Sequence, residues 1–275
     1  MIRPNPMPIE VNVPIEILNQ EQFHALDRQV MRIVFDVHNE FGRLLDEQLY
    51  KREIAARCTA AGLEPVEREV GIRVSHESFF KHYSMDLLIC RGYMLEGKAA
   101  ERLVAAHRAQ SLNYLLLAGM RHGRLVNFRT GLIAHEYIST TLTPEERRSF
   151  IVEDKEWIEE NDRSRLLKNK TVDLLRDWGG FLDGNLYREA LIHFLGGAST
   201  VNRPVQILSG TRQVGSQNLN MASDDTAFAF TTLQGNSGPM GEHLRRLLGH
   251  TPLQRIQWIN LNRQQIEFVT LSKTQ

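Results

Sequence analysis

Three charged residues between positions 86 and 98 have the types and spacing of a hydrolytic metal site. Asp86 is followed ten residues later by Glu96 and then by Lys98. Two neighbouring carboxylates repel each other, and a hard divalent cation such as Mg²⁺ removes that repulsion while it keeps several water ligands. A lysine beside them can orient or deprotonate a water and stabilise the charge that develops on a phosphate. The set therefore predicts hydrolysis of a phosphodiester.

The turn between two predicted strands decides whether these side chains can meet. Glu96 and Lys98 are two residues apart, so both leave the same face of an extended strand. A two-residue loop of Arg91 and Gly92 would point Asp86 to the opposite face. A three-residue loop that begins at Arg91, with Gly92 available for a positive φ, places Asp86 opposite Lys98 on the shared face. We therefore expect an odd-numbered loop or a bulge.

A predicted helix after the second strand adds further polar side chains. Leucine and alanine recur with helical spacing between positions 103 and 116, while His107, Gln110 and Tyr114 form a separate stripe at i, i+3 and i+7. That stripe can face the hairpin. Taken alone, Glu96 and Lys98 are equally typical of a solvent-exposed strand. His107 is a candidate phosphate contact, although an ordinary polar role is the simpler interpretation.

The segment from about residue 30 to residue 128 resembles the GxxExxY family, a branch of the PD-(D/E)XK nuclease superfamily. Several separate motifs carry the resemblance in family order: Val37-His38, Gly42, Leu45, Glu47-x-x-Tyr50, Asp86, Glu96-Gly97-Lys98 and Gln110. Gln110-Ser-Leu-Asn-Tyr114 is also similar to the QxxxY motif of exonuclease branches. The glycine that gives the family its name is replaced by Leu44.

The resemblance implies an α/β fold, of the α+β type with a mixed sheet, built on a restriction-endonuclease-like core in the order αβββαβ. It also implies a metal-dependent deoxyribonuclease that uses Mg²⁺ or Mn²⁺ and acts on DNA. The implied catalytic residues are Asp86, Glu96, Lys98, Gln110, Glu47 and Tyr114. The implied metal ligands are Asp86, Glu96, Glu47 and the backbone carbonyl of Gly97. His38 is a weaker ligand candidate, because a lone helical histidine is more often structural.

Composition limits the partners of the chain. The 33 basic and 33 acidic residues give a formal net charge of zero, so a general polyanion binder is excluded and any basic surface must be local. Two cysteines, Cys58 and Cys90, fit a reducing compartment better than a disulfide framework. Residues 1–20 contain four prolines and no apolar run. We expect an irregular arm there, a cytoplasmic location and no membrane partner.

We expect a nuclease domain at 21–142, a charged helical linker at 143–178 and a C-terminal α+β domain at 179–275. The C-terminal domain shows a faint internal repeat, because its segment 182–188 is similar to 45–51 at a shift of 137 positions, and His243 and Asn260 match His107 and Asn127 at shifts of 136 and 133. Gly184 replaces Glu47 in this alignment, Arg246 matches Gln110, and the counterpart of Glu-x-Lys near 232–234 carries no charge. These matches predict a degenerate, catalytically dead copy of the fold; an unrelated domain is the alternative.

Two other functions remain open at this stage. One is a catalytically silent nucleic-acid-binding or scaffold protein, within a defence or mobile-element system, that keeps the nuclease-like fold. The other is a nuclease that acts as a homodimer or waits for a targeting protein partner. Arginines 245, 246 and 255 could contact phosphates, although they are more typical of an ordinary surface. The complete set of Asp86, Glu-x-Lys and Gln110 favours the enzyme.

Overall fold

The computed structural model describes residues 7–273, which form two compact units. Unit 1 comprises residues 7–75 and 80–144, and unit 2 comprises residues 145–273 together with the hairpin tip 76–79. Within these described residues, no helix has the length and apolar character needed to cross a membrane.

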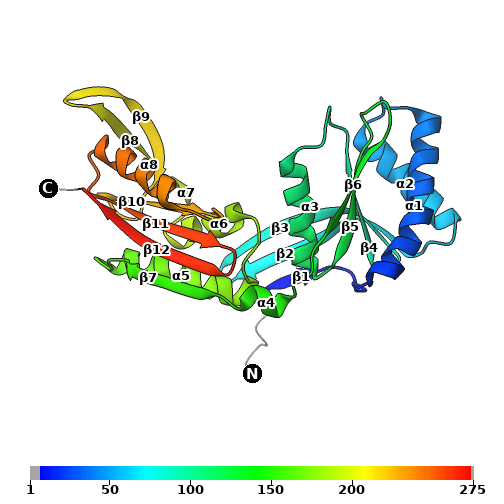
Figure 1. The fold of residues 1–275 in the computed structure, drawn as a ribbon, viewed down its shortest axis with the longest axis horizontal. Coiled ribbons are helices and arrows are strands. Elements are labelled where there is room, and N and C mark those ends of the chain that lie inside the picture. The colour runs from blue at the N-terminus through cyan, green and yellow to red at the C-terminus, as the bar shows by residue number, and fades with distance from the viewer. Residues whose placement is uncertain (1–6, 274–275) are drawn as a thin grey trace. The chain divides into compact units, whose positions relative to one another are not determined.

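Unit 1 is a six-stranded mixed sheet with helices on both faces (Figure 1). The strand order is β1-β2-β3-β4-β5-β6, and β4 and β5 run parallel. The helices are α1 (Gln20–Phe41), α2 (Glu47–Ala60) and α3 (Ala105–Ala118), and the strands are β1 (Ile9–Val11), β2 (Val66–His76), β3 (Phe79–Ile89), β4 (Tyr93–Lys98), β5 (His122–Asn127) and β6 (Ala134–Ser139). The predicted mixed α/β core is confirmed.

Helices α1 and α2 cover one face of this sheet and α3 covers the other (Figure 1). Helix α1 begins with a capping box, in which the Asn19 side chain accepts from the Gln22 N–H and the Gln22 side chain accepts from the Asn19 N–H. Phe23 and Val30, on its apolar stripe, are fully buried. The core between α1, α2 and the sheet fixes where the first turn of α2 meets the ends of the strands.

The turn between β3 and β4 has three residues, which confirms the predicted odd-numbered loop. Leu87 pairs with Leu95, and Ile89 pairs with Tyr93. The loop therefore lies at 90–92, one position earlier than expected. The next residues outward on the two strands are Asp86 and Glu96, so the predicted pairing of Asp86 with Lys98 is wrong by two residues along β4.

Glycine is needed in this turn for a reason other than the expected one. The positive φ angles fall on Cys90 and Arg91, at 49° and 58°, and not on Gly92. A Cβ at Gly92 would lie 2.6 Å from the Leu18 side chain and 2.9 Å from the Glu16 carbonyl oxygen. The glycine thus allows the N-terminal segment to pack closely against the turn.

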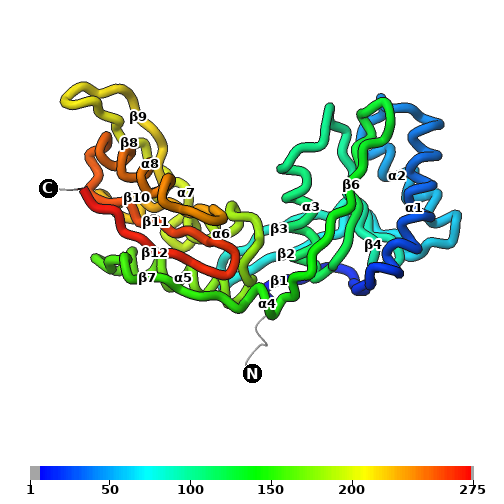
Figure 2. Tube along the Cα trace, viewed as in Figure 1, coloured from blue at the N-terminus to red at the C-terminus, as the bar shows by residue number. Residues whose placement is uncertain are grey.

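Unit 2 contains a four-stranded sheet in the order β10-β11-β12-β7 and a two-stranded ribbon of β8 and β9. The ribbon, yellow in Figure 2, extends beyond that sheet. The helices of unit 2 are α4 (Pro144–Arg148), α5 (Asp162–Trp178), α6 (Gly184–Phe194), α7 (Ala198–Val201) and α8 (Gly238–Gly249). Helix α4 starts on the last residue of unit 1. The strands of unit 2 are β7 (Ile151–Glu156), β8 (Asn202–Ser209), β9 (Arg212–Asn220), β10 (Thr226–Thr231), β11 (Arg255–Asn262) and β12 (Gln265–Ser272).

Two segments differ from the predicted irregular arm and helical linker. Within the described part of the arm, residues 9–11 form β1 and pair with β2; residues 1–6 lie outside the described residues. In the charged segment 143–178, residues 151–156 form β7 and pair with β12. Residues 145–178 of this segment belong to unit 2. The charges of this segment suit an edge strand, where charged side chains limit pairing with other chains.

The two units share an order of elements. Unit 1 runs α1-α2-β2-β3-β4-α3-β5-β6, and unit 2 runs α5-α6-β8-β9-β10-α8-β11-β12 with the short α7 before β8. In both units a helix connects two parallel strands, β4 with β5 and β10 with β11, and an antiparallel strand follows. The units differ in the preceding hairpin, since β8 and β9 form a separate ribbon.

The same buried tyrosine contact occurs in each unit. The Tyr50 hydroxyl donates to the Gly42 carbonyl, and the Tyr187 hydroxyl donates to the Gly179 carbonyl, in both cases eight residues earlier and at the end of the preceding helix. Each bond satisfies a carbonyl at a helix terminus.

An asparagine contact is also repeated. The Asn127 side chain accepts from the Ala100 N–H at 3.0 Å and donates to its carbonyl at 2.7 Å. Asn260 makes the same two bonds with Leu233, at 2.9 and 3.5 Å. This correspondence has a shift of 133 positions, which places Ala229 and Thr231 at the positions of Glu96 and Lys98, a few residues before the predicted 232–234.

We expect Tyr187→Phe to destabilise the chain more than Tyr50→Phe. Both lose a hydrogen bond worth about 1 kcal/mol, but a buried acceptor left without a partner costs about 1–3 kcal/mol. Gly179 is buried whereas Gly42 is exposed, so water can replace the hydroxyl only at Gly42. Urea unfolding of the two variants measures the difference, and equal losses would contradict the contrast.

Candidate active site

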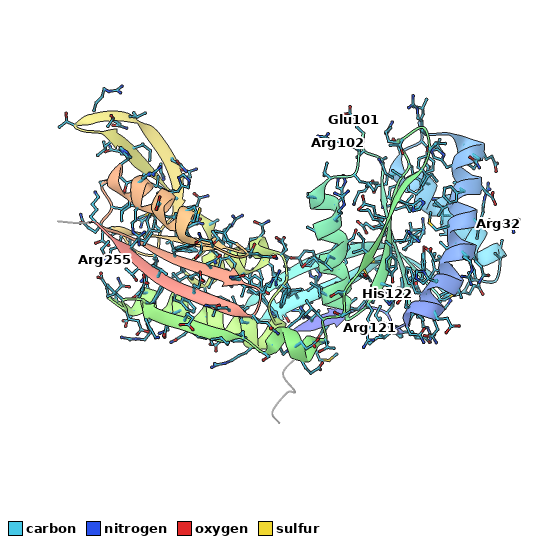
Figure 3. All side chains as sticks on the ribbon, in the orientation of Figure 1. Arg32, Glu101, Arg102, Arg121, His122 and Arg255 are labelled. Carbon is cyan, nitrogen blue, oxygen red and sulfur yellow. The ribbon has the colours of Figure 1, made fainter. Side chains whose placement is uncertain are left out.

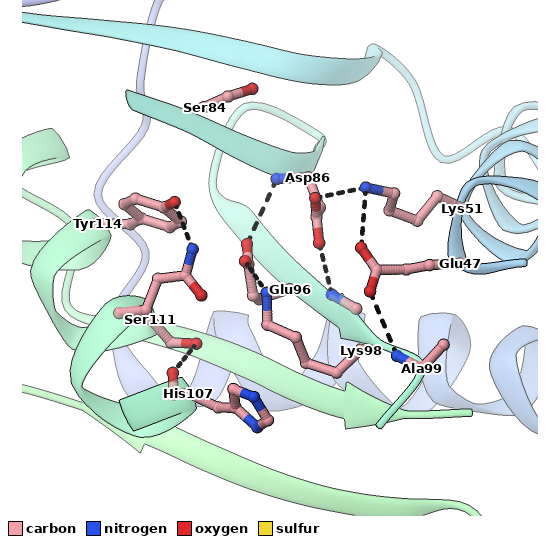
Figure 4. A network of polar contacts seen from close by, with 12 residues as sticks. Glu47, Lys51, Ser84, Asp86, Glu96, Lys98, Ala99, His107, Ser111 and Tyr114 are labelled. Carbon is pink, nitrogen blue, oxygen red and sulfur yellow. Dashed lines mark hydrogen bonds and ion pairs between the residues drawn. The ribbon is translucent and has the colours of Figure 1, made fainter. Parts of the chain in front are cut away.

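Adjacent strands β3 and β4 bring two buried carboxylates together (Figure 4). Asp86 is 7% exposed and Glu96 is 1% exposed. The Gly97 N–H donates to Asp86 Oδ2 at 2.8 Å, and the Asp86 N–H lies 3.4 Å from Glu96 Oε2. These backbone contacts hold both side chains in place on the two adjacent strands.

Each of these carboxylates is paired with a lysine. Lys98 Nζ lies 2.8 Å from Glu96 Oε1, and Lys51 Nζ lies 2.6 Å from Asp86 Oδ1. Lys98 was expected from the sequence and Lys51 was not. Lys51 lies one helical turn after Glu47 on α2, so its spacing from a predicted site residue was the available signal.

Burial dominates the electrostatics of the pair. Desolvation raises the pKa of Asp86, against the hydrogen bond from Lys51. Desolvation likewise raises the pKa of Glu96, and the charge of Asp86 adds to the rise while Lys98 opposes it. Burial disfavours the Lys98 ammonium, but the charge and hydrogen bond of Glu96, together with the charges of Asp86 and Glu47, outweigh this and raise the Lys98 pKa. Lys98 therefore stays protonated at neutral pH.

Two more carboxylates border the pair. Glu47, in the first turn of α2, accepts from the Ala99 N–H at 3.2 Å and lies 3.4 Å from Lys51 Nζ. Glu69 on β2 lies 3.0 Å from Lys51 Nζ. Sequence reasoning missed Glu69, which the sequence places 15 residues before Ser84, its hydrogen-bond partner on β3. Glu47, Glu69, Asp86 and Glu96 are hereafter the carboxylate cluster.

Helix α3 contributes the remaining predicted residues. Gln110 Nε2 donates to the Tyr114 hydroxyl at 2.8 Å, and Tyr114 is 6% exposed. Burial raises the pKa of Tyr114, and the hydrogen bond from Gln110 opposes the rise. Five of the predicted catalytic residues lie in one region of Figure 4, namely Glu47, Asp86, Glu96, Lys98 and Tyr114. The sixth, Gln110, joins them through its hydrogen bond to Tyr114.

The weaker candidates have structural contacts. His38 Nε2 lies 3.2 Å from the Phe128 carbonyl oxygen in the core, and His107 Nδ1 accepts from the Val104 N–H at the start of α3. Arg255, labelled in Figure 3, pairs with Glu160 at 2.6 Å. All three residues therefore have structural contacts, in agreement with the simpler interpretation of each from the sequence.

The carboxylate cluster has the chemistry of a Mg²⁺ or Mn²⁺ site, because all its donors are oxygens. If every group is ionised, four carboxylates face the two ammonium groups of Lys51 and Lys98, which leaves an excess of two negative charges. Across residues 7–273, however, no three His, Cys, Asp or Glu side chains are already grouped to hold a metal ion. The oxygen donors therefore suit a hard divalent cation, and in this structure the ammonium groups of Lys51 and Lys98 pair with them.

The comparison with known families agrees with this geometry. Residues 24–140 match the family model described as the PD-(D/E)XK nuclease superfamily. The matched part of the chain is therefore similar to nuclease-type domains of that superfamily, and it includes all four members of the carboxylate cluster. Searches of curated proteins and of solved structures found no match.

We expect the metal-free protein to lose stability as pH rises from about 4 towards neutral, relative to Glu96→Gln. The folded state holds the Glu96 proton more tightly than the unfolded state does, because burial raises its pKa. Its contribution is therefore present at low pH and is lost as pH rises through the folded value. Melting temperature against pH in EDTA measures this, and parallel curves for the two proteins would contradict it.

Proposed function

We propose that the protein is a Mg²⁺- or Mn²⁺-dependent nuclease that hydrolyses DNA phosphodiester bonds, of the GxxExxY branch. The observation that carries the proposal is the pair of buried carboxylates on adjacent strands, with raised pKa values and Lys98 beside them. Two carboxylates held in this way are costly without a cation.

In this proposal Asp86, Glu96, Glu47 and the backbone carbonyl of Gly97 hold the cation. When bound, it acts as a Lewis acid on the phosphate and lowers the pKa of water. The protein positions these ligands through the rigid β3–β4 hairpin and the first turn of α2. The N–H of Ala99 holds Glu47 beside the end of β4.

Lys98 acts as a charged donor. Because Glu96 raises its pKa, Lys98 keeps its proton, so we assign it the orientation of the attacking water and the stabilisation of charge on the phosphate. Gln110 and Tyr114 are bonded to each other on α3 and steady the site or the DNA.

We propose further that unit 2 is a diverged copy of the same fold that does not cut. The shared order of elements and the repeated tyrosine and asparagine contacts support a common origin. Gly184 takes the position of Glu47, while Ala229 and Thr231 take those of Glu96 and Lys98. This copy lacks the charges of the unit 1 site, so we propose that it acts as an internal pseudo-dimer partner or binds substrate without cutting it.

Cleavage assays with Mg²⁺, Mn²⁺ or EDTA test the proposed activity on plasmid DNA, linear DNA and single-stranded RNA. We expect cutting of DNA with either metal and none in EDTA. Cutting of RNA alone would show that the substrate is RNA and not DNA. Nicking of the plasmid, without shortening of the linear DNA from its ends, would identify an endonuclease. A protein that binds DNA but cuts none of these substrates, with any metal, would favour the silent scaffold.

A further inference from the structure

Lys51 stands at the point where three members of the carboxylate cluster converge. Its Nζ lies 2.6 Å from Asp86 Oδ1, 3.0 Å from Glu69 Oε1 and 3.4 Å from Glu47 Oε1, and its side chain is 4% exposed (Figure 4). A buried ammonium with three carboxylate neighbours is a counter-ion for the site. The chemistry proposed above gives it no role.

Both oxygens of Asp86 are already engaged. Oδ2 accepts from the Gly97 N–H at 2.8 Å, and Oδ1 accepts from Lys51. Each oxygen keeps a second lone pair, but a cation bound at Oδ1 would lie close to the positively charged Lys51 ammonium and be repelled by it. The Gly97 N–H belongs to the backbone of β4 and cannot turn away, whereas the lysine side chain rotates about several bonds. Lys51 is the partner that gives way.

Glu69 offers Lys51 a place to go. It already contacts the ammonium, its side chain is half exposed, and it is held by Gln48 at 3.2 Å and Ser84 at 3.0 Å. Lys51 can therefore leave Asp86 and keep a carboxylate partner. A buried charge that loses all partners would be strongly unfavourable.

We propose that Lys51 is a built-in counter-ion that holds Asp86 in the metal-free protein and exchanges with the divalent cation by moving onto Glu69. This inference rests on the metal site of the proposed function. Before metal arrives, the Lys51 ammonium keeps the carboxylates in place. Because the cation must displace this ammonium, metal binding is weaker than the ligands alone would allow.

Mn²⁺ titration calorimetry on the full chain tests the exchange. We expect Lys51→Met to bind Mn²⁺ about tenfold more tightly than the wild type, because it removes a competing positive charge. Without metal, the same variant should melt at a lower temperature, since Asp86 loses its partner. Lys168→Met is the matched control, because Lys168 pairs with Asp154 and Glu159 in unit 2; its Mn²⁺ affinity should equal that of the wild type.

Glu69→Gln tests the destination and keeps the test usable if Lys51→Met does not fold. It should weaken Mn²⁺ binding about tenfold, and it should have little effect in the Lys51→Met background, because no lysine then needs to move. An equal loss in both backgrounds would show a general charge effect and overturn the transfer to Glu69.

The remaining outcomes separate this inference from the proposed function. Binding by Lys51→Met but not by the wild type would support the exchange and explain a silent protein. Equal or weaker binding by Lys51→Met would overturn the exchange and leave the nuclease proposal standing. No Mn²⁺ binding by any variant would overturn both.

Discussion

Asp86→Asn should abolish metal binding and reduce DNA cleavage by at least about 10³-fold. Asp86 is the central carboxylate of the site, between Lys51 and Gly97. Asparagine has nearly the same shape and still accepts from one donor, but it lacks the negative charge that a hard cation requires. Mn²⁺ titration and a plasmid cleavage rate measure the two effects on the same preparation.

Asp177→Asn is a suitable control for the loss of an acidic side chain, because Asp177 pairs with His76 within unit 2. Its cleavage rate should stay within a few-fold of the wild type. Circular dichroism shows whether each variant is folded. Full activity in folded Asp86→Asn would remove Asp86 from the mechanism and contradict the proposed site.

Lys98→Met should keep metal binding and reduce the cleavage rate by about 10²–10³-fold. The Lys98 ammonium lies 2.8 Å from Glu96 and is assigned to water and to the phosphate, so its loss affects the reaction more than the ligands. Methionine retains the length and apolar stem of lysine in this partly buried position. Single-turnover cleavage at saturating Mn²⁺ measures the rate of the chemical step.

The two lysines are expected to differ in their effect on metal affinity, because Lys51→Met should tighten Mn²⁺ binding and Lys98→Met should leave it unchanged. Lys98→Met and Lys51→Met both remove one ammonium from the site. The Lys51 ammonium holds Asp86 Oδ1, whereas the Lys98 ammonium holds Glu96 Oε1. A cleavage rate unchanged in Lys98→Met would contradict the assigned role. Rescue of the rate by Lys98→Arg would show that charge at this position is sufficient.

The sequence predicts the hairpin well because its constraints are local. Glu96 and Lys98 are two positions apart, and this spacing requires a shared strand face and hence an odd loop to bring Asp86 near them. The structure has that loop. The loop lies one position earlier than predicted, and the partner of Asp86 therefore shifts by two residues. The reason is that the positive φ angles fall on Cys90 and Arg91, whereas sequence preferences favour glycine for such angles.

Lys51 and Glu69 could not be placed in the same way. Their contact joins α2 to β2 across 18 residues, and it depends on how the helix packs against the sheet. Strand β7 was missed for a related reason, since its charges match a surface helix and only pairing with β12 makes it a strand. A local sequence pattern indicates periodicity only, whereas the Lys51–Glu69 contact and strand β7 both depend on tertiary contacts.

One comparison tests the central claim most directly: Mn²⁺ binding and DNA cleavage measured side by side for the wild type, Asp86→Asn and Lys98→Met. A metal-dependent nuclease built on this site predicts that the wild type binds and cuts, that Asp86→Asn does neither, and that Lys98→Met binds without cutting. Cleavage that persists in EDTA, or in folded Asp86→Asn, would contradict the account.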